Sequence, residues 1–104
     1  MAMQFHKSDL KTGMMVELHN GMRYIVMLDT CMDGRSLLTG GKNGYGWLDL
    51  NKYDENLIFS DKGIREKDDS MFWSIKRVYM PNSVNAVGKF RDHRMMWERM
   101  NSYV

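Results

Sequence analysis

The fold is decided by residues 14–27, which read MMVELHNGMRYIVM. Asn20-Gly21 separates two apolar runs, and this dipeptide readily takes the two positive φ values of a type I′ turn. The sequence therefore predicts a β-hairpin with a two-residue loop, in which Val16 lies opposite Ile25. In this register the buried face is expected to hold Met14, Val16, Leu18, Ile25 and Met27. The opposite, mixed face is expected to hold Glu17, His19, Met22 and Tyr24.

Further short strands are expected after this hairpin. The candidates lie at residues 36–39, 47–50, 57–59 and 71–80. The glycine-rich stretch 40–46 is expected to connect the first two as a hairpin loop, because it lacks the Gly-Lys-Ser/Thr ending of a P-loop. In the last candidate, Ile75 and Val78 are three residues apart, which indicates a helical turn entering the strand, and Pro81 is expected to end it. Closely spaced short strands are typical of an antiparallel meander or a small barrel.

The last part of the chain has a different periodicity. Phe90, His93, Trp97 and Met100 recur at intervals of three and four residues, and charged residues fill most of the intervening positions. This spacing predicts an amphipathic C-terminal α-helix. Its apolar stripe is expected to pack against the barrel, a second copy of the chain or a partner.

Length and composition limit the organisation of the chain. With 104 residues, of which 43% are apolar, it can bury one core. We expect a single, mainly β domain over residues 1–104, with a small antiparallel barrel over 1–81 and a helical extension over 82–104. No stretch has the roughly 18 uninterrupted apolar residues of a membrane helix. Cys31 is the sole cysteine, and the N-terminus is too polar for a signal peptide, so a cytoplasmic location is expected.

Charge is unevenly distributed, although the net charge is only +2. Residues 49–69 carry seven acids and four bases, whereas residues 76–104 carry six bases and two acids. Such polarity can steer an anionic partner, or can attract the two segments to each other or to a neighbouring subunit. The twelve methionines can line an adaptable contact surface as well as fill the core.

Patterns that support catalysis or metal binding are weak in this sequence. His6, His19 and His93 fall in different predicted elements, and none has a second ligand at zinc-site spacing. The acids cluster in segments that read as surface loops. Cys31 with His19 is the one nucleophile and base pair worth naming, and it has no recognisable local signature. We expect a non-enzymatic protein with no catalytic residue, no metal and no cofactor.

Aromatic and basic residues instead indicate a binding surface. Aromatic rings beside basic groups can hold nucleobases and phosphates, and they are also common anchors of protein interfaces. The alternative is that most of these rings close a small barrel. Trp47 and Arg77 are the preferred candidates. The full set for partner contact is Trp47, Trp73, Arg77, Arg94 and Trp97, and the set for ligand contact is Tyr45, Tyr53 and Tyr79.

Several stretches carry a resemblance to known proteins. They are Asp9-Leu10-Lys11, Gly13-Met14, Val16-Glu17-Leu18, Asn20-Gly21, Arg23-Tyr24, Tyr53, Asn56-Leu57, Ile75, Val78-Tyr79 and Pro81. In these residues the chain resembles a group of small uncharacterised proteins encoded by phages and prophages of Gram-positive bacteria, over about two-thirds of its length. The resemblance implies an SH3-like barrel and phage ancestry. The chain departs from the group in its methionine content and its aromatic, basic C-terminal segment.

The resemblance also shapes what we expect of function. A small non-enzymatic phage protein is expected to antagonise a host defence system by binding a host protein, with the apolar stripe as anchor. One alternative is an oligomeric sponge that sequesters a nucleotide signal between aromatic rings and arginines. Others are an RNA- or DNA-binding accessory module and a virion assembly component. A homo-oligomer is compatible with each of these, and no membrane partner is expected.

Overall fold

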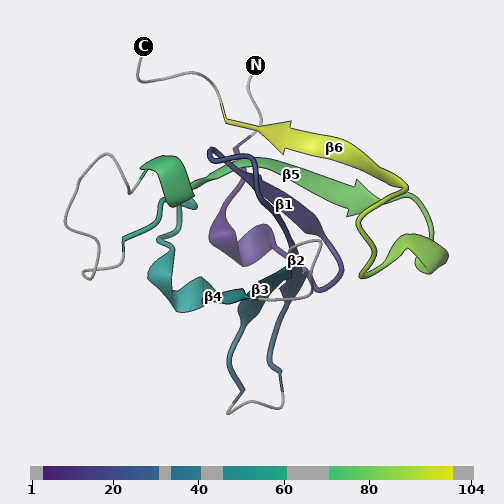
Figure 1. Ribbon diagram of the computed structural model, residues 1–104, viewed down its shortest axis with the longest axis horizontal. Coiled ribbons are helices and arrows are strands. Elements are labelled where there is room, and N and C mark those ends of the chain that lie inside the picture. The colour runs from purple at the N-terminus through teal and green to yellow at the C-terminus, as the bar shows by residue number, and fades with distance from the viewer. Residues whose placement is uncertain (1–3, 31–33, 41–45, 61–70, 100–104) are drawn as a thin grey trace.

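The chain forms a six-stranded antiparallel sheet in a computed structural model that describes residues 4–30, 34–40, 46–60 and 71–99 (Figure 1). The strands are β1 (Met15–Leu18), β2 (Arg23–Met27), β3 (Leu37–Gly40), β4 (Trp47–Asp49), β5 (Ile75–Pro81) and β6 (His93–Glu98). Between and beside them lie the 3₁₀ helices η1 (Lys7–Asp9), η2 (Leu50–Lys52) and η3 (Val84–Ala86). The order of strands in the sheet is β4-β3-β2-β1-β5-β6. β1 is therefore an inner strand that joins the N-terminal hairpins to the β5–β6 hairpin.

The β1–β2 hairpin is confirmed, but its register differs from the expected one by a single residue. Met15, not Val16, lies opposite Ile25. The N–H of Leu18 donates to the carbonyl of Met22 at 2.9 Å, and the N–H of Gly21 donates to the carbonyl of Leu18 at 2.9 Å. The loop thus has one more residue than expected. Gly21 has a φ of 90°, as is usual for the last residue of a three-residue hairpin loop.

A shift of one residue exchanges the two faces of a strand, because side chains alternate along it. Tyr24, expected on the mixed face, is only 4% exposed and packs in the core. Met27, expected in the core, is 42% exposed on the other face. The face assignment from the sequence is therefore wrong for β2. The residues that enter the core from this hairpin are Met14, Val16, Leu18, Tyr24 and Val26.

The other expected strands lie close to their predicted positions. β3 and β4 pair with each other, with Leu38 opposite Leu48. Segment 57–59 contributes only an isolated bridge, between Tyr53 and Phe59. Residues 71–73 form a helical turn before β5, but Ile75 and Val78, whose spacing indicated such a turn, both lie in the strand. Lys76 is an extra residue in the pairing with β1, and this β-bulge accounts for the spacing. β5 ends at Pro81, as expected.

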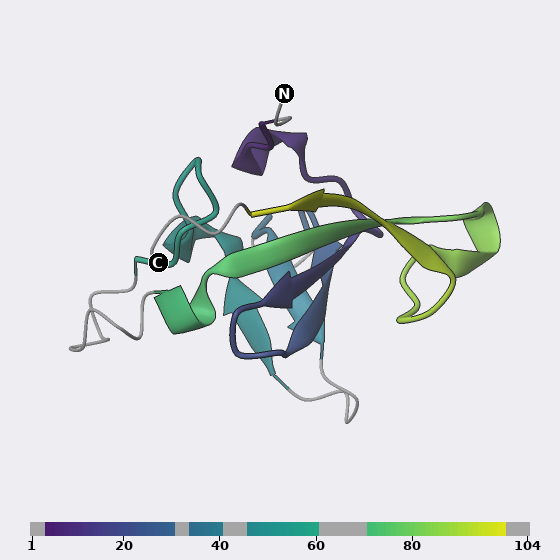
Figure 2. The ribbon, with the colours of Figure 1, turned by 90° about the horizontal axis from the view of Figure 1, so that it is seen from above.

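The predicted C-terminal helix is wrong for the described residues, because His93–Glu98 is strand β6, which pairs with β5. Figure 2 shows β5 and β6 side by side, running out to the η3 turn. Val78 lies opposite Trp97, but Tyr79 lies opposite Met95, so Met96 is an extra residue in the strand. Such a β-bulge interrupts the alternation of side chains, which explains why the spacing resembled that of a helix. Residues 100–104 lie outside the described part of the chain.

The core lies on one face of the sheet, between the strands and segment 50–59. Leu50, Tyr53, Leu57 and Phe59 pack there against the strand residues, together with Phe5 and Leu10 from the N-terminal segment. Each such side chain stabilises the fold by about 1.5–3 kcal/mol when it is fully removed from water. Burial of these residues therefore fixes segment 50–59 against the sheet.

Hydrogen bonds join segment 53–59 to the start of β5. The N–H of Ile75 donates to the carbonyl of Leu57 at 3.1 Å, and the N–H of Phe59 donates to the buried Ser74 Oγ at 2.9 Å. Arg99, next to β6, donates to the carbonyls of Ile75, Asn56 and Leu57 at 2.9 to 3.3 Å. One guanidinium thus connects the end of β6 with β5 and with segment 53–59.

Candidate binding site

The face of the sheet that points away from the core carries two rows of side chains. We call it the outer face. Residues directly opposite each other on neighbouring strands share a face, so the strand pairs define each row. The first row crosses all six strands and holds Trp47, Thr39, Ile25, Met15, Tyr79 and Met95. The second row holds Arg23, Glu17, Arg77 and Glu98.

The second row alternates in charge and is internally paired. Arg77 donates from Nη1 to Glu17 Oε2 at 2.9 Å and from Nε to Glu98 Oε2 at 2.8 Å. The hydrogen bond to Glu98 is the largest of the effects that raise the pKa of Arg77. Arg23 Nε lies 3.3 Å from Glu17 Oε1. The two arginines of this row are therefore already paired with carboxylates.

Tyr79 connects the two rows. Its hydroxyl donates to Glu17 Oε1 at 3.1 Å, and the Arg23 guanidinium lies 5.5 Å from its ring centroid. Burial raises the pKa of Tyr79, and the hydrogen bond to Glu17 raises it further. Tyr79 is therefore held as a neutral hydrogen-bond donor in this network.

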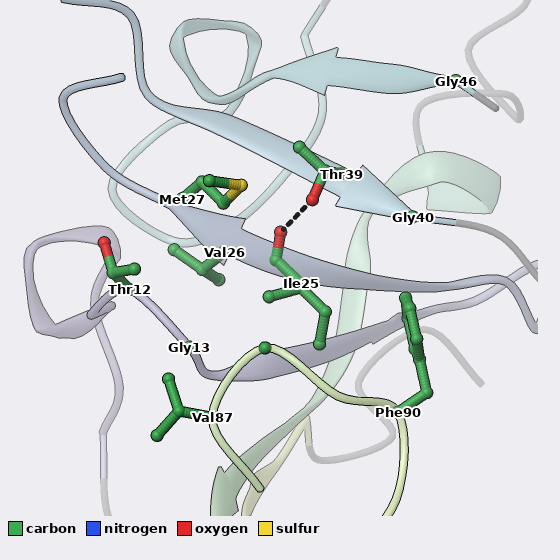
Figure 3. A pocket seen from close by; sticks show the side chains of 11 residues that line it. Thr12, Gly13, Ile25, Val26, Met27, Thr39, Gly40, Gly46, Val87 and Phe90 are labelled. Atoms are coloured by element: carbon green, nitrogen blue, oxygen red, sulfur yellow. Dashed lines mark hydrogen bonds between the residues drawn. The ribbon is translucent and has the colours of Figure 1, made fainter. Parts of the chain in front are cut away.

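The β5–β6 connection comprises residues 82–92. A groove of about 430 Å³ lies where this connection crosses the outer face (Figure 3). Ile25 and Met27 of β2 lie on one side of it, and Val87 and Phe90 of the connection lie on the other. Four glycines also line the groove. They are Gly13, Gly40, Gly46 and Gly88.

The connection is held close to the sheet at Gly13. A Cβ atom at this position would lie 2.6 Å from Val87 Cγ1, so a larger residue would force the two segments apart. The ring of His93 also faces this point, with Nε2 3.3 Å from the Gly13 carbonyl. Gly13 therefore allows the approach that forms one end of the groove.

Exposed apolar side chains gather around this groove. Met27, Trp47, Val87 and Phe90 are each between 40% and 47% exposed. Met95, at the β6 end of the first row, is 50% exposed. Single exposed apolar residues are normal on protein surfaces, whereas a group of them on one face marks a binding surface.

The structure brings three of the expected contact residues together on the outer face. Trp47 and Tyr79 share the first row, and Arg77 lies in the second. Arg94 is exposed on β6, where its guanidinium donates to Asn82 Oδ1 at 3.2 Å. Tyr45 lies outside the described residues.

The remaining candidates pack on the core side of the sheet. Trp97 packs on Phe5 with a ring-centroid distance of 5.8 Å, and Trp73 packs on Phe59 at 6.2 Å. Tyr53 is 2% exposed, and its hydroxyl donates to the Trp73 carbonyl at 2.7 Å. Burial raises the pKa of this phenol. These three rings therefore contribute to packing rather than to the outer face.

Sequence reasoning missed the residues that form the groove. Val87 lay in a segment without a clear pattern, and Phe90 was assigned to the helical stripe. Met27 was placed in the core by the shifted register. The signal that could have found them is Gly88-Lys89-Phe90-Arg91, an aromatic residue between two bases after a glycine.

In the ranges that the structure describes, no three His, Cys, Asp or Glu side chains come together, and no helix is long and apolar enough to span a membrane. Comparison of the chain with family models, curated proteins and solved structures gave no match.

Proposed function

We propose that this chain is a non-enzymatic binding protein that recognises another protein through its outer face. The observation that carries this proposal is that the exposed Met27, Val87 and Phe90 line one groove, with the exposed Trp47 opposite its lining residue Thr39. Aromatic residues and methionine are enriched in protein interfaces, where they fill pockets and exclude water. The paired charges of the second row would then form a polar rim.

The pairing of the outer-face arginines favours a protein partner over a free nucleotide. A nucleotide sponge needs cations that are available to phosphate, but Arg23 and Arg77 are both paired with Glu17. Displacing these contacts would leave a half-buried carboxylate without its partner, which costs free energy. A protein that fills the apolar groove and leaves the second row paired does not carry this cost.

The resemblance to phage and prophage proteins directs this proposal to a particular setting. We infer a small SH3-like barrel that acts in the host cytoplasm and inhibits a defence protein by occupying its surface. The hydrogen bonds from β5 and Arg99 to segment 53–59 support closure of the sheet into such a barrel. The carbonyl oxygens of Asn56 and Leu57 accept these hydrogen bonds. Segment 53–59, which follows β4, is therefore held next to β5.

Nucleic-acid binding is a second candidate, which one observation favours. Lys89 and Arg91 are both exposed and flank the partly exposed ring of Phe90 in the sequence, and Arg94 is exposed at the start of β6. Aromatic stacking beside basic groups is a common mode of single-strand recognition. This candidate predicts affinity that falls steeply as the salt concentration rises.

The proposed function is tested by quantitative affinity capture from an extract of the organism that encodes the chain. Tagged wild-type protein is compared with Phe90→Ser and with Trp47→Ser. We expect a specific set of proteins to be enriched by the wild type and lost from both variants. Native mass spectrometry of the same material shows whether a small molecule or a nucleic acid is bound.

Phe72→Ser is the matched control, because Phe72 is also about half exposed but precedes β5, at the end of that strand away from the connection (Figure 1). Its captured proteins should equal those of the wild type. Enrichment that survives in Phe90→Ser and Trp47→Ser would contradict the proposal. A co-purifying nucleotide in place of a protein would also contradict it.

A further inference from the structure

The residues on either side of Phe90, which lines the groove, are basic, and we call them the basic rim. Lys89 and Arg91 flank this ring in the sequence, and both are exposed. Within the part of the chain that the structure describes, neither side chain forms an ion pair. The carboxylate of the neighbouring Asp92 accepts a hydrogen bond from Asn82 Nδ2 at 3.1 Å. Two cations thus remain available at the mouth of an apolar groove.

The groove suits a large apolar side chain. Its volume of about 430 Å³ falls within the range of roughly 300–1,000 Å³ that is usual for ligand sites. The Phe90 ring and the Met27 thioether can both contact an aromatic ring favourably. Gly46 lines the groove with open space where a side chain would lie, which allows the main chain of an extended segment to approach closely.

The charges of the outer face limit what can lie across it. Glu17 and Glu98 belong to this face, and Asp49 lies in line with Met27 through Leu37. Because both glutamates are already paired with Arg23 and Arg77, these two arginines are not available to a phosphate backbone that crosses the face, and such a backbone would also pass the Asp49 carboxylate. A short acidic segment can keep its own carboxylates at the basic rim and place only an apolar side chain in the groove.

We propose that the groove takes an acidic segment of a partner protein, with one phenylalanine or tryptophan side chain between Ile25 and Phe90. The carboxylates on either side of that ring face Lys89 and Arg91. This inference rests on the proposed function, because it specifies the chemistry of the protein that the outer face recognises.

The test uses a fluorescein-labelled synthetic peptide with phenylalanine at its centre, flanked by glutamate and aspartate. Its binding to the full chain is followed by fluorescence anisotropy at low salt. We expect Phe90→Ala to weaken binding roughly tenfold, because an apolar contact worth about 1.5 kcal/mol is removed. Lys89→Glu should weaken binding by a similar factor, and this effect should shrink as salt is added. Phe72→Ala and Lys76→Glu, which change residues distant from the connection, should bind as the wild type does.

The peptide itself provides matched controls, because an alanine-centred peptide and a lysine-flanked peptide should each bind at least roughly tenfold more weakly. In ¹⁵N-labelled protein, the acidic peptide should shift the amide signals of Gly13, Gly40, Gly46 and Gly88. Equal binding of the lysine-flanked peptide, or shifts confined to other residues, would overturn the inference.

The remaining outcomes separate this inference from the proposed function. If no acidic peptide binds but partner capture still depends on Phe90, the segment chemistry is wrong and the proposed function stands. If a labelled oligothymidylate binds more tightly than the peptide and competes with it, the inference is overturned in favour of nucleic acid.

Discussion

At the residue scale, Arg99, near the end of the described chain, forms hydrogen bonds with two other segments. Its guanidinium donates to the carbonyls of Ile75, Asn56 and Leu57, and it lies 5.3 Å from the centroid of the Trp97 ring. A planar guanidinium can serve several carbonyls at once, whereas an ammonium group cannot reach them in the same geometry. Arg99 therefore holds three segments in one arrangement.

Arg99→Lys is expected to lower the free energy of unfolding by about 2 kcal/mol, because it removes hydrogen bonds from a charged donor while it retains the charge. Urea denaturation followed by circular dichroism measures the change. Arg94→Lys is the control, since the exposed Arg94 guanidinium contacts only Asn82 and Pro81 among the described residues. Equal losses from the two substitutions would show that Arg99 has no special role.

His19 gives the fold a dependence on pH. Its Nδ1–H and its main-chain N–H both donate to the Ser74 carbonyl at 3.0 Å. Burial lowers the pKa of His19 below its ordinary value of 6.5, the Ser74 hydrogen bond opposes this shift, and the charges of Arg99, Lys76 and Arg77 add to it. The folded state therefore binds fewer protons at His19 than the unfolded state does, in the pH range just below 6.5.

The free energy of unfolding should accordingly fall as pH drops below about 6.5, and His19→Gln should show a shallower decrease than the wild type. The two proteins are compared by urea denaturation at a series of pH values, because the difference between them isolates His19 from the carboxylates that titrate at lower pH. Parallel curves for the two proteins would refute this assignment.

At the scale of elements, the β5–β6 connection covers part of the outer face, and we expect that it can be replaced without unpairing β5 and β6. Its two ends already meet, since the N–H of Asn82 donates to the carbonyl of Asp92 at 2.9 Å. Replacing residues 83–91 by a short Asn-Gly turn should leave the strands paired but remove one wall of the groove. The expected loss of stability is about 2 kcal/mol, because Ile25 becomes exposed and the buried Ala86 is removed.

Amide exchange and peptide binding check this prediction on the same variant. Protection of β5 and β6 should persist, whereas binding of the acidic peptide should be lost. Collapse of amide protection throughout β6 would instead mean that the connection is needed to form the hairpin.

The elements could be predicted where local sequence determines them. Asn20-Gly21 identified the first hairpin, and Pro81 identified the end of β5. The spacing of Ile75 and Val78 was misleading, because it reflects a β-bulge at Lys76 and not a helical turn. The register could not be predicted, because both faces of β1 and β2 are apolar. Met15 and Ile25 are as well buried as the residues that enter the core, so a pattern of alternation could not distinguish the two faces.

β6 could not be predicted for a different reason. Its strand conformation depends on pairing with β5, which is a long-range interaction that local periodicity does not contain. The bulge at Met96 also places Met96 and Trp97 side by side against the core, and so removes the alternation that marks a strand. The predicted stripe is divided between two faces, because Trp97 packs on the core side whereas Phe90 lines the groove on the outer face.

At the scale of the whole molecule, β1 makes the N-terminal and C-terminal halves depend on each other. It pairs with β2 on one side and with β5 on the other. Neither half can bury the core face of β1 alone, so we expect one cooperative unfolding transition. The pairing of β1 with β5 brings distant parts of the chain together, and folding is expected on the slow scale of β-rich domains, about milliseconds to seconds.

Coincident transitions by circular dichroism and tryptophan fluorescence in urea would establish this cooperativity. Trp73 and Trp97 report on the core side and Trp47 reports on the outer face. A fluorescence transition that precedes the loss of circular dichroism would indicate that the β5–β6 hairpin separates first.

The candidate site could be predicted only in part, because it is assembled by the whole molecule. Trp47, Arg77 and Tyr79 were recognised as individual residues, and the sheet brings them to one face. The groove depends on how closely the connection approaches the sheet at Gly13, which no local motif encodes. Tyr53 and Trp97 are aromatic residues like Trp47, and the sequence alone does not indicate which of these rings pack on the core side and which lie on the outer face.

The extra residue at Met96 also bears on how the molecule behaves in crowded solutions. β6 ends the ladder at one side of the sheet, and β4, which ends it at the other, is only three residues long. An incoming strand from a second copy would lose its alignment at the bulge, where the regular spacing of donors and acceptors is broken. We therefore expect the molecule to resist edge-to-edge stacking into fibres.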